Sequence, residues 1–260
     1  MSRQSGQNMR VTRGRSSRRE FLAGSGQVFT GSVLAGGLLS RAYAGEDNTI
    51  RLALVGCGGR GGGAAANAMS SKTGPTKLIA MADVFEGRLA QSHKALSEQF
   101  GGQIDVPPDR RFVGFNAYRK AIDCLRPGDV MIQATHSAFR PTHLKYAVRK
   151  GVNAFIEKSF APDPAGTKEI LQLGEEAKKK DLKVSCGLMC RHSSARQAMI
   201  RTIREGALGQ IQLIRAYRMD PGARMGPFPG GESELLWQIR RPYFFVWVSS
   251  AWFIEMMIHQ

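Results

Sequence analysis

The stretch IRLALVGCGGRG, residues 50–61, decides the fold. Its first six residues are a short apolar run, which is typical of a buried strand. Glycines then follow with G-x-G-x-x-G spacing, and the alanine-rich segment 61–70 predicts a helix. In such a turn the first glycine allows a tight bend, the second lets a pyrophosphate approach the backbone, and the third lets helix pack on strand. We therefore predict that a dinucleotide binds at Gly56, Cys57, Gly58, Gly59, Arg60 and Gly61.

Strands and helices alternate beyond this turn. The predicted strands are 77–82, 130–134, 152–156 and 182–188, and the predicted helices are 85–100, 117–125, 141–150, 163–180 and 193–205. Pro141 suits a first helical turn, Asp163 suits a helix cap, and 101–111 is expected to be a loop. The alternation predicts the fold class α/β: a Rossmann-type parallel sheet with helices on both faces. Ligands of such sheets bind at the carboxyl ends of the strands.

Asp83 ends the second predicted strand, 22 residues beyond Gly61. An acidic residue at this spacing binds the ribose 2′-hydroxyl of a dinucleotide. Its negative charge would repel a 2′-phosphate, so NAD is the preferred cofactor and NADP is the alternative. A cap for the helix that starts at Phe85 is the other interpretation of Asp83, and both roles can coexist.

The pattern changes after Gly209. Residues 211–219 alternate as a long strand, 221–231 are rich in Gly and Pro, and an aromatic segment then runs from Trp237 to Phe253. We interpret this part as the incomplete start of an α+β second domain. The predicted domains are a signal peptide at 1–44, an NAD(P)-binding Rossmann domain at 45–192, and the truncated start of a substrate domain at 193–260.

Two further patterns suit acid–base chemistry. Lys158 follows the predicted strand 152–156, where a lysine can hold a substrate oxygen or assist proton transfer; a surface lysine is the alternative. Glu255 and His259 are four residues apart, so on a helix they share a face. The carboxylate can then orient the imidazole as a base, although spacing alone does not single this pair out.

The distribution of charge argues against a nucleic-acid-binding surface, and the spacing of the cysteines argues against a zinc site. The net charge is +16, but residues 1–44 hold seven Arg and one Glu, which leaves 30 basic and 20 acidic residues in 45–260. The remaining excess is spread along helices, so we prefer solvated faces to a nucleic-acid surface. Cys186 and Cys190, followed by His192, lack the spacing of a zinc site, so we expect buried strand thiols and no metal.

The N-terminus has the pattern of an export signal. Residues 17–22, SRREFL, contain twin arginines, an uncharged stretch to Leu39 follows, and Ala42-Tyr43-Ala44 is a cleavage site of A-x-A type. The uncharged stretch is glycine-rich and a poor membrane span. We predict twin-arginine export to the periplasm or an equivalent exported location, with no stable span after cleavage. An uncleaved anchor or a basic tail is the alternative.

Five motifs together resemble the glucose–fructose oxidoreductase / inositol dehydrogenase / MocA family. They are VGCGGRG at 55–61, ADV at 82–84, ATH at 134–136, EKS at 157–159 and EGALGQI at 205–211. The likeness covers about residues 49–260, and the twin-arginine signal resembles an exported bacterial subgroup. Two departures stand out: Ser159 replaces the proline of the family's Glu-Lys-Pro, and the chain ends where family members continue for another domain. We therefore interpret it as a truncated or split member.

The resemblance implies roles for individual residues. Thr135 and Glu157 would contact the cofactor, and Lys158 would contact both the nicotinamide ribose and the substrate. Glu255 and His259 fit the family's Asp-x-x-x-His, which makes His259 the proton acceptor and Glu255 its orienting carboxylate. Many relatives have a histidine where Arg140 stands, so no role is assigned there.

These observations predict an NAD(P)-dependent oxidoreductase that transfers hydride from a sugar, cyclitol or related polyol. Two alternatives stay open: an NAD-dependent glycosidase of the same family, and an inactive nucleotide-binding fragment. The expected partner is a small carbohydrate or polyol, with no nucleic acid. A homo-oligomer is expected only if the protein is full-length.

Overall fold

The computed structural model describes residues 48–219, 224–250, 255–256 and 258. The chain divides after Asn48 into two units, and the second unit contains every element described below. The predicted signal at 1–44 lies outside the described residues, as does His259. None of the described helices combines the length and apolar character that a bilayer crossing requires.

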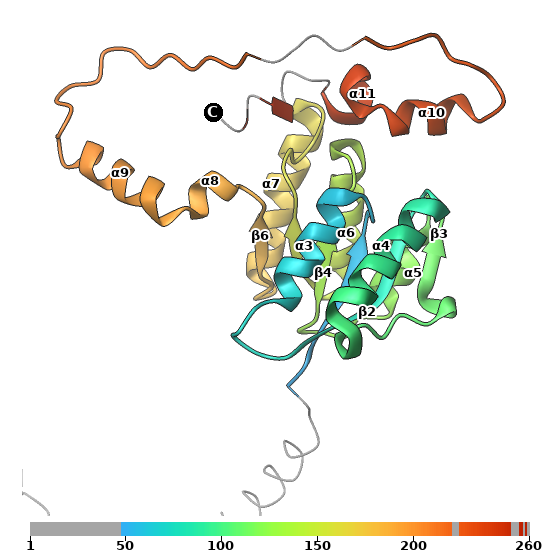
Figure 1. Cartoon of the computed structure of the whole chain (residues 1–260). Helices are drawn as coiled ribbons and strands as arrows, with labels where there is room; N and C mark the ends of the chain where they lie inside the picture. Colours follow the sequence, from blue (N-terminus) through green and yellow to red (C-terminus); the bar gives the residue numbers. More distant parts are fainter. Residues whose placement is uncertain (1–47, 220–223, 251–254, 257, 259–260) are drawn as a thin grey trace, which may run out of the picture. The chain divides into compact units, whose positions relative to one another are not determined.

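Six parallel strands form one sheet, which confirms the predicted fold class (Figure 1). The strands are β1 (Ile50–Val55), β2 (Thr76–Asp83), β3 (Arg111–Val113), β4 (Val130–Gln133), β5 (Asn153–Ile156) and β6 (Val184–Cys186). Their spatial order is β3-β2-β1-β4-β5-β6, and each neighbouring pair is parallel. Chain order reverses direction between β1 and β4, and open α/β sheets bind their ligands at such a switch point.

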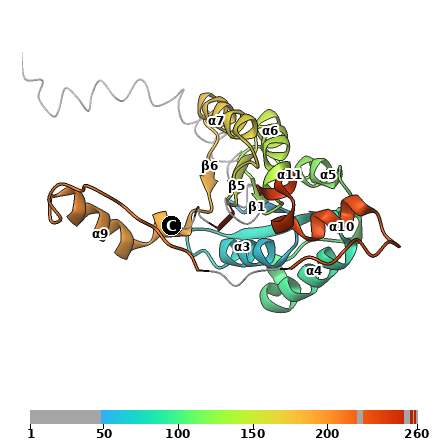
Figure 2. The same cartoon turned by 90° about the horizontal axis from the view of Figure 1, so that it is seen from above.

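Helices cover both faces of this sheet, with α3 and α4 on one side and α5, α6 and α7 on the other (Figure 2). Their bounds are α3 (Gly59–Met69), α4 (Glu86–Phe100), α5 (Ala117–Asp123), α6 (Arg140–Lys150) and α7 (Pro164–Lys179). Alternate residues of β1 separate the two cores: Leu52 and Leu54 pack with α3 and α4, and Ala53 and Val55 pack on the opposite face. A strand buried on both faces has the continuous apolar run found in the sequence.

The helix signals read from the sequence agree with the structure. Pro141 lies in the first turn of α6, where its missing N–H leaves no hydrogen bond unmade. This helix ends at Gly151, which has a left-handed φ of 73°. Asp163 caps α7, since its Oδ1 accepts a hydrogen bond from the Gly166 amide at 2.7 Å. These residues set where α6 starts and ends and where α7 starts.

The segment 101–111, expected to be a loop, is more ordered than predicted. It contains the short 3-10 helices η1 (Gly101–Gln103) and η2 (Pro108–Arg110), and Arg111 then starts β3 at the sheet edge. The three residues of β3 pair only with β2. So short a strand has no alternating pattern long enough to be recognised.

The prediction of a strand over 211–219 is wrong. These residues have no regular secondary structure, and Ile214 and Met219 are 79% and 90% exposed. A strand forms only when a neighbour satisfies its backbone, and no described strand pairs with this segment. Cys186 lies in β6 as expected, but it is only partly buried; Cys190 is also partly buried and lies in the short helix α8 (Met189–His192), so the expectation of buried strand thiols fails.

The remaining described elements follow β6. They are α9 (Ser194–Arg204), α10 (Glu234–Arg240), the 3-10 helix η4 (Pro242–Phe244) and α11 (Val246–Ser249). Trp237, Ile239 and Val248 are buried, whereas no residue of α9 is. We call residues 234–256 the C-terminal segment, of which 234–250 and 255–256 are described.

Candidate functional site

The glycine turn between β1 and α3 has no room for side chains at two positions. Gly56 has a φ of +95°, and a Cβ there would lie 2.7 Å from the Thr135 amide nitrogen. A Cβ on Gly61 would lie 1.8 Å from the Gly56 carbonyl oxygen. In contrast, a Cβ on Gly58 would meet no atom within 4 Å. The turn is therefore closed towards the sheet and open above Gly58, at the amino end of α3, where an anion can approach backbone amides.

Asp83 ties the end of β2 to this turn. Its Oδ2 accepts a hydrogen bond from the Cys57 amide at 2.6 Å, and its Oδ1 accepts one from the Phe85 amide at 2.9 Å. Each carboxylate oxygen can accept a further bond, so a ribose hydroxyl and the backbone can share this residue. The interpretation of Asp83 as a helix cap is wrong, because Phe85 occupies the N-cap position of α4 (Glu86–Phe100) and the helix has no side-chain cap; Asp83 bonds the amide of the residue before the helix. Burial raises the pKa of the Cys57 thiol well above its usual value, so this thiol stays protonated beside the carboxylate.

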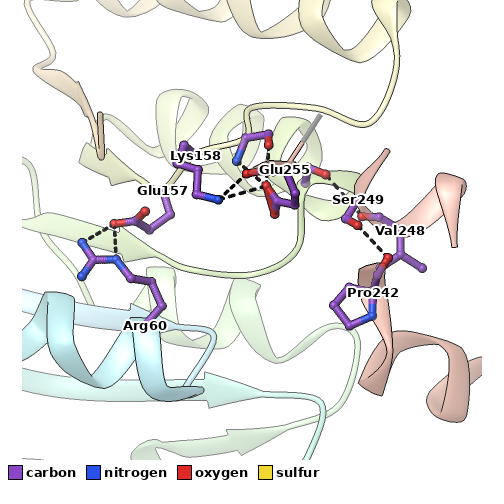
Figure 3. A network of polar contacts seen from close by, with 9 residues as sticks. Arg60, Glu157, Lys158, Pro242, Val248, Ser249 and Glu255 are labelled. Atoms are coloured by element: carbon purple, nitrogen blue, oxygen red, sulfur yellow. Dashed lines mark hydrogen bonds and ion pairs between the residues drawn. The ribbon is translucent and has the colours of Figure 1, made fainter. Parts of the chain in front are cut away.

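Glu157 connects the same turn to the end of β5. Its Oε1 lies 2.7 Å from Arg60 Nε and 2.5 Å from Arg60 Nη2, and the carboxylate is buried (Figure 3). Gly187 makes room for it, because a Cβ at that position would lie 2.6 Å from Glu157 Oε1. Arg60 is thus bonded to the residue that follows β5, and it lines the same cavity as Gly58.

Lys158 meets the C-terminal segment at Glu255 (Figure 3). Its Nζ donates to the Glu255 carbonyl oxygen at 2.8 Å and lies 3.4 Å from Glu255 Oε2. The same Oε2 accepts bonds from the Ser159 amide at 3.2 Å and the Ser159 hydroxyl at 2.5 Å. The Lys158–Ser159 peptide bond is cis. Lys158 and Glu255 were predicted to share one site, with the carboxylate paired to His259, which lies outside the described residues.

One cavity of about 800 Å³ joins these groups, within the size range of cofactor sites. It runs along the carboxyl ends of β2, β1, β4 and β5, and the C-terminal segment supplies part of its wall through Arg240, Tyr243 and Glu255. Every residue predicted to bind cofactor lines it, namely Gly56, Cys57, Gly58, Gly59, Arg60, Gly61, Asp83, Thr135, Glu157 and Lys158. The sequence motifs, far apart in the chain, therefore converge on one space.

Aromatic and basic side chains frame the Asp83 end of the cavity. Two guanidinium carbons lie over the Phe85 ring, that of Arg88 at 4.8 Å and that of Arg240 at 4.1 Å from its centroid. Arg240 comes from α10, so the C-terminal segment reaches this end as well as the Lys158 end. Neither arginine was predicted to line the site, and no helix was predicted at α10.

Three further basic side chains line the cavity without a predicted role: Arg140 and His143, which are buried, and His136, which is partly buried. Arg140 lines the cavity at the start of α6, and burial lowers its pKa to about 10. Burial, followed by the charge of Arg140, lowers the pKa of His136 to about 4 and that of His143 to about 3. Both imidazoles are thus neutral at neutral pH. His143 stacks on Tyr118 with ring centroids 4.0 Å apart, and its Nδ1 lies 3.4 Å from Thr135 Oγ1.

The strand order, the glycine turn and the cavity at the switch point define a Rossmann-type nucleotide-binding fold. No known family profile and no curated protein sequence matches the chain. A solved structure of myo-inositol 2-dehydrogenase from Lactobacillus plantarum has 21% identity and a TM-score of 0.50, covering 63% of this chain and 43% of that one. This likeness establishes the fold.

Two other solved structures match this chain with similar identity, TM-score and coverage. The WlbA dehydrogenase from Chromobacterium violaceum, in complex with NADH and UDP-GlcNAcA, has 23% identity and a TM-score of 0.47, covering 63% of this chain and 42% of that one. The apo scyllo-inositol dehydrogenase from Lactobacillus casei has 19% identity and a TM-score of 0.47, covering 63% and 44%. The chain thus spans less than half the length of the dehydrogenases it matches.

Proposed function

We propose that the cavity binds NAD and that the chain is the nucleotide-binding part of an oxidoreductase of the glucose–fructose oxidoreductase / inositol dehydrogenase / MocA family. The observation that carries this proposal is the single cavity at the sheet's switch point, which the glycine turn, Asp83 and Lys158 line together. The fold of myo-inositol 2-dehydrogenase supports it. The proposed substrate is a sugar, cyclitol or related polyol, oxidised at a carbon that bears a hydroxyl group.

The residues present suit a dinucleotide. The open space above Gly58 and the amides at the amino end of α3 suit a pyrophosphate, which the helix dipole also attracts. The Asp83 carboxylate suits a ribose hydroxyl and disfavours an added phosphate, so NAD is the proposed cofactor and NADP the alternative. The Arg60 guanidinium, fixed by Glu157, adds a positive charge near the turn.

The chemistry follows from the other end of the cavity. A bound nicotinamide supplies the hydride acceptor. The Lys158 ammonium can hold a substrate hydroxyl and stabilise negative charge that develops on its oxygen. Glu255 fixes this ammonium through its carbonyl and carboxylate oxygens, which is a positioning role. His259 remains the proposed acceptor of the hydroxyl proton.

Binding of NADH is the direct test, followed by its fluorescence or by calorimetry. We expect the wild-type chain to bind, and Gly58→Trp to lose measurable binding because the indole fills the space proposed for the pyrophosphate. Gly174→Trp is the matched control, since Gly174 on α7 has open space around its Cβ position and does not line the cavity. No binding by the wild type, or equal binding by the Gly58 and Gly174 variants, would refute the proposal.

Turnover separates the enzyme from the inactive alternative. Reduction of NAD by any member of a sugar and cyclitol panel supports the oxidoreductase. NADH binding without turnover of any polyol favours a nucleotide-binding fragment. Lys158→Met should abolish turnover while leaving the glycine turn intact.

Export by the twin-arginine route is part of the same proposal and is supported by the SRREFL motif at 17–22 and the A-x-A site at 42–44. Replacing Arg18 and Arg19 by lysine should leave the protein in the cytoplasm. Export of that variant at the wild-type level would contradict the proposal. We also propose that the full-length protein forms a homo-oligomer, which light scattering after size exclusion measures; a monomer would contradict it.

A further inference from the structure

Ser159 is a buried residue that the proposed chemistry does not use. It follows Lys158 beyond the end of β5 and is only 1% exposed. Both of its donor groups bind a single atom, because Glu255 Oε2 accepts the Ser159 hydroxyl at 2.5 Å and the Ser159 amide at 3.2 Å. One serine thus binds, through side chain and backbone, a carboxylate oxygen that the C-terminal segment brings to the sheet edge.

The Lys158 ammonium lies farther from the same oxygen than Ser159 does. Its Nζ is 3.4 Å from Glu255 Oε2, whereas a hydrogen bond between an ammonium and a carboxylate is usually about 2.7–2.9 Å long. A hydroxyl binds a carboxylate oxygen at about 2.5–2.7 Å, and the Ser159 hydroxyl meets this distance. The Glu255 carboxylate is therefore bound closely by Ser159 and only loosely by Lys158.

This separation leaves donors of the Lys158 ammonium for a ligand. The group has three N–H donors, and among the described residues only Glu255 accepts from it, through its carbonyl oxygen and loosely through Oε2 (Figure 3). Lys158 also lines the cavity. Opposite charges that are both mostly buried attract strongly, so a second donor has to hold this carboxylate if the ion pair is to stay open.

We propose that Ser159 is a positioning residue, which holds the Glu255 carboxylate away from the Lys158 ammonium and so keeps Lys158 able to bind the substrate. The effect on turnover rests on the proposed function, whereas the separation of the two charges does not. Without the Ser159 hydroxyl, the carboxylate moves onto the ammonium, which is its nearest charged donor. A closely paired ammonium releases its proton less readily and stabilises less negative charge on a substrate oxygen.

Competitive acetylation of the 260-residue chain by acetic anhydride, measured by mass spectrometry, tests the inference without nucleotide. Only the unprotonated amine reacts, and Lys178, exposed on α7, is the reference within the same molecule. In Ser159→Ala, the acetylation rate of Lys158 relative to Lys178 should fall about 10-fold, as expected when one hydrogen bond to a charged group is lost. A loosened segment would instead expose Lys158, so an unchanged or faster rate would overturn the inference.

Two further variants show whether Ser159 acts through Glu255. Ser137→Ala is the matched control, because Ser137 is a buried serine whose hydroxyl also binds the C-terminal segment, at the Val248 carbonyl. It should keep the wild-type acetylation rate of Lys158. In a Glu255→Gln background, Ser159→Ala should no longer slow the reaction, since the negative charge that moves onto Lys158 is gone. Equal slowing in Ser137→Ala, or a slowing that persists in that background, would overturn the inference.

The outcomes distinguish this inference from the proposed function. A wild-type chain that fails to bind NADH refutes the function, while the acetylation rates still decide whether Ser159 separates the two charges. A chain that binds NADH but whose Lys158 rate ignores Ser159→Ala refutes only the inference. Where the chain turns over a polyol, Ser159→Ala should lower kcat about 10-fold and leave NADH binding, which also reports a folded cavity, near the wild-type level. An unchanged kcat would contradict the role in turnover.

Discussion

Residues 50–186 and the residues after them differ in where their apolar side chains lie. In the first region, the side chains of β1, β2 and β4 fill two cores beneath helices. In the second, α9 buries nothing, and Leu213, Ile214 and Tyr217 are exposed. A region that buries its apolar surface within its own layers can be stable by itself, whereas one that exposes it depends on other contacts.

The C-terminal segment differs from α9, because it buries apolar side chains and contacts the first region. Trp237 packs edge-on against Phe245, the Ser137 hydroxyl donates to the Val248 carbonyl at 3.3 Å, and Lys158 binds Glu255. Ser137 and Lys158 follow β4 and β5 at the ligand edge of the sheet. The segment is therefore attached at the carboxyl edge of the sheet and contributes to the wall of the proposed nucleotide site, so nucleotide binding and the order of this segment are expected to be linked.

The largest expected effect is a loss of stability on shortening a core side chain. Leu54 is fully buried, and Leu54→Ala should lower the free energy of unfolding by about 2–5 kcal/mol through lost burial and a cavity. Met199 on α9 is 55% exposed, and Met199→Ala should change it by less than about 0.5 kcal/mol. Urea denaturation measures both, and equal effects would remove the contrast between the two regions.

Glu255→Gln should loosen the C-terminal segment without unfolding the sheet. The Glu255 carboxylate accepts bonds from the Ser159 amide and hydroxyl and lies beside the Lys158 ammonium, and hydrogen bonds to charged groups contribute about 1.5–3 kcal/mol. Hydrogen exchange should therefore rise over 234–250 and stay constant in β1 and β4. Equal acceleration in both regions would mean that they unfold as one unit.

Acidification should weaken the first region through His143. Its folded pKa of about 3 lies below its unfolded value of 6.5, so the unfolded chain binds the proton more readily between these values. Stability is then present in full above pH 6.5 and is lost as the pH falls, by about 2 kcal/mol at pH 5 for one such histidine. His143→Phe keeps a ring against Tyr118 and should remove about half of the loss from pH 7 to 5, because the lowered pKa of His136 contributes the rest. If the free energy of unfolding of this variant depended on pH as in the wild type, the lost stability could not come from His143.

The smallest expected effect concerns a helix cap. Asp163→Ala should lower the free energy of unfolding by about 1 kcal/mol, because the Gly166 amide loses its acceptor. Asp163→Asn keeps an acceptor and should recover most of this loss. Thermal melts of the two variants provide the comparison, and identical midpoints would show that the cap contributes nothing.

Much of the first region was predictable because its signals are local. The apolar run at 50–55, the glycine spacing at 56–61 and the cap at Asp163 each depend on a few adjacent residues. The strand β3 escaped prediction because three residues carry no pattern, and 211–219 was mispredicted because alternation does not reveal whether a partner strand exists.

The site was only partly predictable for a related reason. Motifs identified Asp83 and Lys158, since a position after a strand implies the ligand edge. The partnership of Lys158 with Glu255 joins residues 97 apart, and nothing in the sequence sets that distance. Arg140 was left without a role because many relatives have a histidine at this position, and its burial follows only from how α6 packs.

Amide NMR of the ¹⁵N-labelled chain during an NADH titration tests the placement of the nucleotide most directly. We predict that the largest shift changes fall on the amides of Gly58, Gly59 and Arg60, with smaller changes at Phe85 beside Asp83. Inorganic pyrophosphate alone should perturb the first three and leave Phe85 unchanged. Shift changes confined to residues after β6, or none at saturating NADH, would contradict the placement of the nucleotide at the amino end of α3.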